Sequence, residues 1–460
     1  MRALLERQRA AFARSPFPSS AERRKKLRRL RAAVRGRKDA LCDAIAQDFG
    51  GRSRTESLMA DVLGPVLEIN HALAHVGSWM ERRRRRPELL FLSNRAWVEY
   101  QPKGVVGIIS PWNFPGYLTL GPLVAALAAG NRAMIKMSES TPVTTAVMRE
   151  LLAECFDEDE VWITGGDVEV GKVFAALPFD HLVFTGSTDV GRSVMRAAAE
   201  NLVPVTLELG GKSPAIVSRS ANVDEAALKI VHGKVFNCGQ ICVSPDYALV
   251  PRELEPAFMH AARAAFARLA PDPATDPDYT CIVSDRHAAR MQALLDDARA
   301  HGASVFSCGE SADPRKLPLH LVGGITDAMR IAREEIFGPL LPVVPYERIE
   351  DAAAYVAARP RPLALYIFGR DGHEAAAIRR ATHSGGVTLN DWGWHVLQHD
   401  LPFGGIGASG MGSYHGEEGF RALSHARSVF SERRFFPIAL FHPPYGRLAQ
   451  RLLLRLFLGS

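Results

Sequence analysis

A regular alternation of short apolar runs with helical stretches is the feature that most limits the folds open to this chain of 460 residues. It begins near residue 104, and short apolar runs between helical stretches are typical of buried strands. The alternation predicts strands at Val105–Ile109, Ala133–Met137, Val161–Thr164 and His181–Thr185, and helices at Thr119–Ala129 and Pro142–Phe156. Strands that alternate with helices form parallel sheets with helices on both faces. The sequence therefore predicts a doubly wound α/β domain.

A second series of the same kind begins near Gly210. Helices are predicted at Asp224–Phe236, Leu254–Leu269 and Asp285–His301, and strands at Ser304–Ser307 and Leu363–Phe368. Two series predict two parallel-sheet α/β domains with a cleft between them. Residues 80–104 and 392–430 fit neither series, so we expect them to form a third, small element.

The composition is that of an ordinary globular protein, with 47% hydrophobic and 23% charged residues. No apolar run reaches the roughly 18 residues that a membrane-spanning helix needs. The start, Met1–Ser15, is rich in Arg and lacks the apolar core of a secretory signal. We therefore expect a cytoplasmic protein.

The net charge of +6 comes from basic residues near the two ends of the chain, including the runs Arg23–Lys38 and Arg82–Arg86. Leu27, Leu30 and Val34 recur at helical spacing within the first run, which predicts an amphipathic surface helix. No aromatic residues interleave the Arg residues, and no nucleic-acid motif is visible. A solvated helix face is therefore favoured over contact with nucleic acid.

Six cysteines are present, and only Cys238 and Cys242 lie close together. Their spacing lacks the partner ligands that a zinc site needs, so no metal is predicted. Cys242 follows a predicted helix and a loop with Gly239. A thiolate there would be a strong nucleophile toward a carbonyl carbon. The alternative is a small buried hydrophobic residue.

Glu208 lies in the apolar strand that leads into the Gly210-Gly211 turn. Burial between Leu207 and Leu209 would raise the pKa of its carboxyl, which suits a general base. The alternative is a strand-end carboxylate that points to solvent.

Asn113 follows the strand Val105–Ile109, and loops at the carboxyl ends of parallel strands are where ligands bind. Its amide could donate a hydrogen bond to an oxyanion, unless the Asn-Phe-Pro turn is only structural. The strand His181–Thr185 leads into Gly186, Ser187 and Gly191, where a helix start could bind a pyrophosphate.

Together these segments resemble the aldehyde dehydrogenase superfamily from about residue 40 to 430. The resemblance rests on SPWNFP, AALAAGN, IKMSES, FTGSTDVG, VTLELGGKSP, FNCGQICV, EEIFGP and LPFGGIGASGMG, in the order of the family. The sequence PFGGIGASGMGSYHGEEGF is most similar to the class 3 branch. NDWGWH, at Asn390–His395, is most similar to the bacterial coniferyl aldehyde dehydrogenases.

The resemblance implies a role for each matching residue. Cys242 would be the nucleophile, Glu208 the general base, and Asn113 with the Cys242 N–H the oxyanion hole. The residues implied for cofactor binding are Trp112, Lys136, Glu139, Gly186, Ser187, Gly191, Glu335 and Phe337. The implied division is an NAD(P)-binding domain (1–79 and 105–209), a catalytic domain (210–391), an oligomerisation element (80–104 and 392–430) and an amphipathic tail (431–460).

The implied reaction is NAD(P)+-dependent oxidation of an aldehyde to the acid, through a thiohemiacetal and a thioester on Cys242. Glu139 favours NAD+ because a carboxylate repels a 2′-phosphate, although NADP+ stays open. A CoA-acylating semialdehyde dehydrogenase and a non-catalytic binding protein are the alternatives. Glu208 argues against the first, because CoA transfer needs no base that activates water.

The expected substrate is an aromatic aldehyde, with coniferyl aldehyde as the leading prediction. Tyr117, Trp392 and Trp394 could line an aromatic pocket, or the tryptophans could pack a domain junction. Met137 and Cys238 depart from the family pattern, and we hypothesise that Cys238 pairs with Cys242 under oxidation.

The segment Arg447–Leu458 predicts an amphipathic helix. It could lie on an anionic membrane surface. Docking on a partner subunit of a homodimer, as in some class 3 relatives, is favoured.

Overall fold

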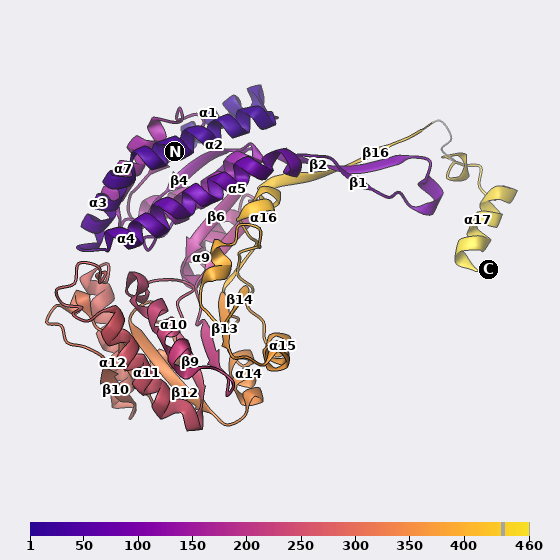
Figure 1. Ribbon diagram of the computed structural model, residues 1–460. Coiled ribbons are helices and arrows are strands. Elements are labelled where there is room, and N and C mark those ends of the chain that lie inside the picture. Colours follow the sequence, from indigo (N-terminus) through magenta and orange to yellow (C-terminus); the bar gives the residue numbers. More distant parts are fainter. Residues whose placement is uncertain (434–437, 460) are drawn as a thin grey trace.

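The computed structural model, which describes residues 1–433 and 438–459, contains two α/β domains and a projecting arm (Figure 1). The first domain is built on a sheet of order β15-β7-β6-β3-β4-β5, parallel except for β15. Its strands are β3 (Val105–Ile109), β4 (Arg132–Lys136), β5 (Val161–Thr164), β6 (His181–Gly186), β7 (Val205–Leu209) and β15 (Gly410–Met411). This sheet confirms the first predicted series.

Alternate residues of these strands face two different helix layers. Val106 and Ile108 pack with one layer, and Val105 packs with the other, as the period-two geometry of a strand requires. The first layer comprises α2 (Ser20–Gly36), α3 (Lys38–Phe49), α5 (Gly64–Trp79), α6 (Tyr117–Ala129) and α7 (Pro142–Ala153). The second comprises α1 (Arg2–Arg14), α8 (Val168–Ala175) and α9 (Thr188–Ala199).

The second domain is built on a sheet of order β10-β11-β12-β9-β8-β13-β14. All neighbours are parallel except β10 and β11. Its strands are β8 (Pro214–Val217), β9 (Tyr247–Pro251), β10 (Ser304–Ser307), β11 (His320–Gly323), β12 (Leu340–Tyr346), β13 (Ala364–Phe368) and β14 (Gly386–Leu389). The helices are α10 (Val223–Val235), α11 (Glu255–Leu269), α12 (Asp285–Ala300), the short α13 (Arg330–Arg333), α14 (Ile349–Ala357) and α15 (Gly372–Ala381). The two-domain prediction is confirmed.

A three-stranded antiparallel sheet of order β1-β2-β16 projects from the body as an arm (Figure 1). It contains β1 (Arg83–Arg85), β2 (Arg95–Pro102) and β16 (Ser424–Ser431), and α17 (Leu448–Leu458) lies at its far end. The arm thus draws on both segments that fit neither series. The rest of 392–430 lies against the body, with α16 (Gly416–Ala422) beside α5 and α6.

The basic run Arg23–Lys38 lies on α2, and Leu27, Leu30 and Val34 are buried as expected. Arg23 does not belong to the solvated helix face that the sequence predicts for this run, because its side chain is fully buried. Its guanidinium donates hydrogen bonds to the carbonyl oxygens of Pro18 at 3.0 Å and Ala128 at 2.9 Å. Local spacing could not reveal these carbonyl partners.

Within the described residues, no helix combines the length and the apolar character that crossing a bilayer requires. The cytoplasmic location stays a prediction.

Candidate active site

The loop that carries Cys242 has an unusual backbone. After α10, Asn237, Cys238 and Gly239 all have left-handed φ angles, of 49°, 53° and 69°. A Cβ on Gly239 would lie 2.6 Å from the carbonyl oxygen of Gly338, so only glycine fits there. The helix therefore ends at Val235, one residue before the predicted end at Phe236. Cys242, which follows the turn, is partly exposed.

Glu208 lies near the end of β7, opposite Gly410 of β15. It is 2% exposed, so the alternative of a solvent-facing carboxylate is wrong. Neither carboxylate oxygen makes a hydrogen bond within the described protein. Burial without a counter-charge raises the pKa of Glu208 well above its usual value. A carboxyl group of this kind binds protons readily, as a general base must.

Glu335 is a second carboxylate near the thiol. It accepts a hydrogen bond from the Gly211 N–H at 3.0 Å, and a Cβ on Gly210 would lie 2.2 Å from its Oε2. The glycine pair therefore lets Glu335 approach the end of β7. Burial raises the pKa of Cys242 to about 12, and Glu335 and Glu208 both add to this. The thiol is consequently protonated at neutral pH, and its activation requires a base.

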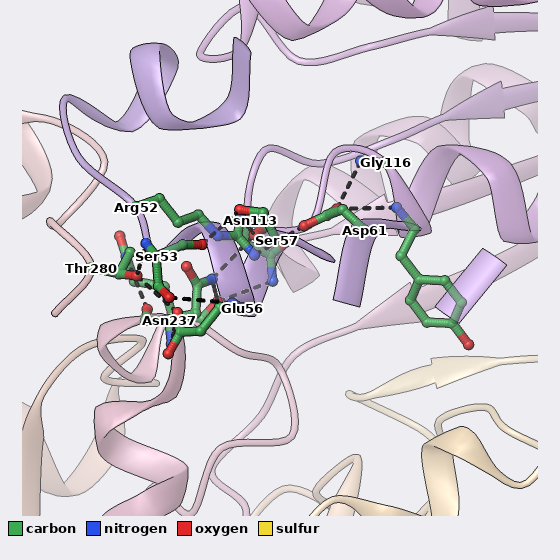
Figure 2. Close-up of polar contacts among 11 residues, drawn as sticks. Arg52, Ser53, Glu56, Ser57, Asp61, Asn113, Gly116, Asn237 and Thr280 are labelled. Carbon is green, nitrogen blue, oxygen red and sulfur yellow. Dashed lines mark hydrogen bonds and ion pairs between the residues drawn. The ribbon is translucent and has the colours of Figure 1, made fainter. Parts of the chain in front are cut away.

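Asn113 is buried between the two domains and is hydrogen-bonded to the Cys242 loop. Its Nδ2 donates to the Gln240 carbonyl oxygen at 3.1 Å, and Asn237 Nδ2 donates to the Asn113 carbonyl oxygen at 3.1 Å. Figure 2 shows Asn113 and Asn237 side by side. The proposed oxyanion donor and the nucleophile loop are therefore fixed to each other.

A buried ion pair supports this contact from the N-terminal helices (Figure 2). Arg52 and Asp61 lie 3.0 Å apart with no side-chain exposure, and Arg52 also donates to the Asn113 carbonyl oxygen at 2.8 Å. Asp61 accepts from the N–H groups of Gly116 and Tyr117, at 2.9 and 3.1 Å. The ion pair thereby fixes both ends of the Asn113 loop.

Glu56, also in the N-terminal part of the chain, contacts the loop that carries Cys242. It accepts from the Asn237 N–H at 3.0 Å and from the Thr280 hydroxyl at 2.8 Å. The sequence analysis missed Arg52, Glu56 and Asp61. No motif marks them, since their partners lie on other elements far along the chain.

Lys136 and Glu139 lie together at the carboxyl end of β4. Lys136 Nζ is 3.3 Å from Glu139 Oε2, with the lysine buried and the carboxylate half-exposed. Ser187 caps α9, where its hydroxyl accepts from the Val190 N–H at 3.4 Å. A Cβ on Gly191 would lie 2.6 Å from Leu209, so this glycine lets α9 pack closely on β7. An ammonium, a carboxylate and an exposed helix start fit a nucleotide with ribose hydroxyls and phosphates.

Trp112 and Phe337 are brought together from the two domains, with ring centroids 5.4 Å apart. Phe337 has a left-handed φ of 55°. Lys212 anchors this segment, since it pairs with Asp246 and donates to the Glu334 carbonyl oxygen at 2.9 Å. One predicted cofactor residue from each domain thus meets the other at the boundary between the domains.

The three predicted pocket residues are not brought together. Trp392 is buried, donates to His232 at 3.0 Å and packs on Phe236, whereas Trp394 is exposed. Within residues 1–433 and 438–459, no ring contact joins Tyr117 to either tryptophan. Phe236 instead continues an aromatic cluster, because it stacks on Phe114 at 6.3 Å.

Cys238 is fully buried, and its thiol donates to the Tyr279 hydroxyl at 3.8 Å. Pairing with Cys242 would require the side chain to leave this packed site. The redox hypothesis is therefore not supported by the geometry.

The comparisons with known proteins agree with the fold. The chain belongs to the aldehyde dehydrogenase family, whose model matches residues 2–429. It is 50% identical over 457 residues to a probable coniferyl aldehyde dehydrogenase of Pseudomonas aeruginosa, covering 99% of this chain and 96% of the relative. It is 46% identical over 423 residues to a coniferyl aldehyde dehydrogenase of Pseudomonas sp., covering 90% and 88%.

Among solved structures, Staphylococcus aureus AldH in its substrate-bound state has a TM-score of 0.93 and 33% identity, covering 99% of both chains. A betaine aldehyde dehydrogenase of S. aureus in complex with NAD+ has a TM-score of 0.84 and 25% identity, covering 93% and 86%. The predicted family is thus confirmed. The chain is an NAD(P)-dependent enzyme that oxidises an aldehyde to the acid, and the CoA-acylating and non-catalytic alternatives are not favoured.

Replacing Arg52 with Met should destabilise the fold strongly. Removing one partner of a buried ion pair leaves the other charge uncompensated, at a cost of about 3–5 kcal/mol. Urea denaturation followed by circular dichroism would measure this loss in the free energy of unfolding. The double variant Arg52→Met/Asp61→Leu should be more stable than Arg52→Met alone, and equal stability of the two would contradict the argument.

Replacing Glu335 with Gln should make the thiol of Cys242 more reactive. The Glu335 carboxylate raises the pKa of this thiol, so its removal lowers that pKa and increases the thiolate fraction at any pH below it. We expect alkylation by iodoacetamide to accelerate roughly tenfold for each pKa unit lost. Mass spectrometry of the Cys242 peptide measures the rate, and an unchanged or slower rate would refute the assignment.

Proposed function

We propose that Cys242, Glu208 and Asn113 carry out the oxidation. The observation that most supports this is the hydrogen bond of 3.1 Å from the Asn113 amide to the carbonyl oxygen of Gln240, two residues before the partly exposed Cys242. In addition to burial, Glu335 and Glu208 both raise the pKa of the Cys242 thiol.

Each residue has a distinct task in this proposal. Cys242 loses its proton to a base and adds to the aldehyde carbonyl, which gives a thiohemiacetal. The Asn113 amide and the Cys242 N–H stabilise the oxyanion, and one such donor is worth a factor of about a hundred or more. After oxidation the thioester remains on Cys242, and Glu208 deprotonates the water that hydrolyses it.

The residues that would hold the nicotinamide cofactor are Lys136 and Glu139 for the ribose, Ser187 at the start of α9 for the pyrophosphate, and Glu335 with Phe337 near the thiol. When bound, the cofactor accepts the hydride. The half-exposed Glu139 carboxylate supports a preference for NAD+, because it accepts from a 2′-hydroxyl and repels a 2′-phosphate.

For the substrate we propose an aromatic aldehyde of the coniferyl type. Two relatives with about half of their residues identical bear coniferyl aldehyde dehydrogenase names. The cluster of Phe114, Phe236 and Trp392 supports this, since Phe236 begins the loop that leads to Cys242 and flat rings pack well against one another.

A panel of cinnamaldehydes, benzaldehydes and alkanals, each with NAD+ and with NADP+, tests the proposal. We expect the highest kcat/KM for coniferyl aldehyde, and an advantage of NAD+ over NADP+ of roughly tenfold, equivalent to 1.4 kcal/mol. Absorbance of the reduced cofactor measures the rates. Cys242→Ala should show no turnover, and Glu139→Gln should reduce the NAD+ advantage. Full activity of Cys242→Ala, or no activity of the wild type on any aldehyde, would overturn the proposal.

We infer that the arm joins two copies of the chain into a homodimer. Its strand β16 forms one edge of a sheet, and exposed sheet edges are templates for pairing. Leu89 and Leu92 are exposed on the arm, and the apolar side of α17 is exposed at its end. Because α17 lies at the far end of this same arm (Figure 1), we favour its docking on a partner subunit over a membrane surface.

Light scattering tests this inference. The wild type should have twice the 50.3 kDa of the chain. Leu89→Asp, on the arm, should shift the protein toward monomer because a charge replaces an exposed apolar side chain. Phe306→Asp, on the distant edge strand β10, is the matched control and should stay dimeric. A monomeric wild type would exclude the inference.

A further inference from the structure

The main chain around Glu335 and Phe337 is bound by cationic side chains from other elements. We name residues 331–338 the cofactor segment, because it carries the two residues proposed to lie against the nicotinamide and its ribose. After the short helix α13 the backbone is extended at Glu334, and Phe337 then has a left-handed φ of 55°. A bulky residue keeps such a conformation only where the surrounding contacts determine it. The contacts that determine it here are hydrogen bonds to consecutive parts of the segment.

The first part of the segment is held by the Lys212–Asp246 ion pair. The Lys212 ammonium donates to the carbonyl oxygens of Ile331 at 2.8 Å and Glu334 at 2.9 Å. The Oδ2 atom of Asp246 accepts from the Ile336 N–H at 2.8 Å. Lys212 lies between β7 and β8, so the ion pair attaches the segment to the junction of the two domain sheets.

The centre of the segment is held by a guanidinium group. Arg290 on α12 donates from Nη1 to the Ile336 carbonyl oxygen at 2.7 Å, and from Nη2 to the Glu335 carbonyl oxygen. The Arg290 guanidinium also lies 3.5 Å from the Glu334 carboxylate. A planar guanidinium presents its N–H groups as a rigid fork, so two such bonds fix orientation as well as distance. The two carbonyl groups directly precede Phe337, and Arg290 thereby fixes the peptide planes next to the left-handed residue.

The last part of the segment is held by Lys234 of α10. Its side chain is buried, and Nζ donates to the Gly338 carbonyl oxygen at 3.2 Å. This is the carbonyl group that passes close to Gly239, in the turn before Cys242. The segment is therefore bound before and after Phe337, and Arg290 provides the two bonds nearest to it on the N-terminal side.

The helix that carries Arg290 also contacts the aromatic residues at the domain boundary. His287 lies three residues before Arg290, so both are on one face of α12. The ring centroids of His287 and Trp112 are 5.0 Å apart, and those of Trp112 and Phe337 are 5.4 Å apart. The helix thus supports Phe337 in two ways, through the main chain by Arg290 and through the rings by Trp112.

We propose that Arg290 is a positioning residue for the cofactor, because its two main-chain bonds hold Glu335 and Phe337 in the conformation that binds the nicotinamide and its ribose. This inference rests on the proposed role of Glu335 and Phe337. Arg290 acts through these two residues and not on the reacting atoms. Without its fork the left-handed turn competes with commoner conformations, and the apparent cofactor affinity falls by the fraction of molecules that lose the turn.

Arg290→Met tests this role, because methionine keeps an unbranched side chain but has no N–H donors. The Arg290 side chain is 33% exposed, so its replacement should leave the fold intact, which urea denaturation followed by circular dichroism checks. We expect the Kd for NADH, measured by fluorescence titration without aldehyde, to rise roughly tenfold, as when about one molecule in ten keeps the competent turn. The KM for NAD+ should rise in parallel, whereas the KM for the aldehyde should stay within about twofold.

Two further variants separate position from charge. Arg290→Lys keeps the positive charge, but an ammonium group lacks the planar fork, so this variant should recover only part of the NADH affinity. Arg299→Met, at the far end of α12, is the matched control, because Arg299 pairs with Asp296 at the surface. It should bind NADH as the wild type does.

Three outcomes would overturn the positioning role. They are wild-type NADH binding by Arg290→Met, full recovery by Arg290→Lys, and an equal rise of KM for the cofactor and the aldehyde. Glu335→Gln distinguishes this failure from failure of the proposed function. If Glu335→Gln weakens NADH binding and Arg290→Met does not, only the role of Arg290 fails. If neither variant weakens it, the proposed role of Glu335 fails as well.

Discussion

The buried Arg52–Asp61 ion pair is the interaction on which the site most depends. Two charges without solvent contact depend on each other and on further hydrogen bonds for their stability. Arg52 donates to the Asn113 carbonyl oxygen and Asp61 accepts from the Gly116 N–H, while Arg52 Nε has no partner in the described protein. The ion pair thus fixes the position of the Asn113 amide relative to the Cys242 loop. Folding of this region and the geometry of the candidate site therefore depend on the same contacts. Rigidity of this kind is what a preorganised oxyanion donor needs.

The sequence predicted the strands and helices well, because the apolar patterns that form them lie within short stretches of the chain. The apolar runs at Val105–Ile109 and Val161–Thr164 coincide with β3 and β5. The predicted helix at Asp224–Phe236 ended one residue too late, because the backbone turns left-handed at Asn237 and Cys238 and then passes close to Gly338 of a distant loop at Gly239. Arg23, whose burial depends on the carbonyl group of Ala128 on α6, was missed for the same reason.

Candidate site residues were predictable only where their own chemical type and their neighbours in the sequence indicate a reactive group. Glu208, between two leucines, and Cys242, after a glycine loop, were singled out as candidates, and the family resemblance gave their roles, which stay predictions. Glu56 and Arg52 were not, because their partners lie far along the chain. Trp394 shows the opposite error, since an aromatic residue beside a motif was expected in the pocket and lies at the surface. Aromatic content alone does not say which ring faces a cleft.

The segment from Gly410 to Ser431 contacts the active-site strand, the helix layer and the arm in succession. It pairs with the strand of Glu208, then contributes Tyr414 and His415 to the interior, then packs α16 against α5, and finally becomes the edge strand of the arm. A stretch this continuous cannot be shifted at one end without strain at the other. Mutations that loosen the arm are therefore expected to act on catalysis at a distance, and an insertion anywhere in this segment would disturb the arm and the candidate active site together.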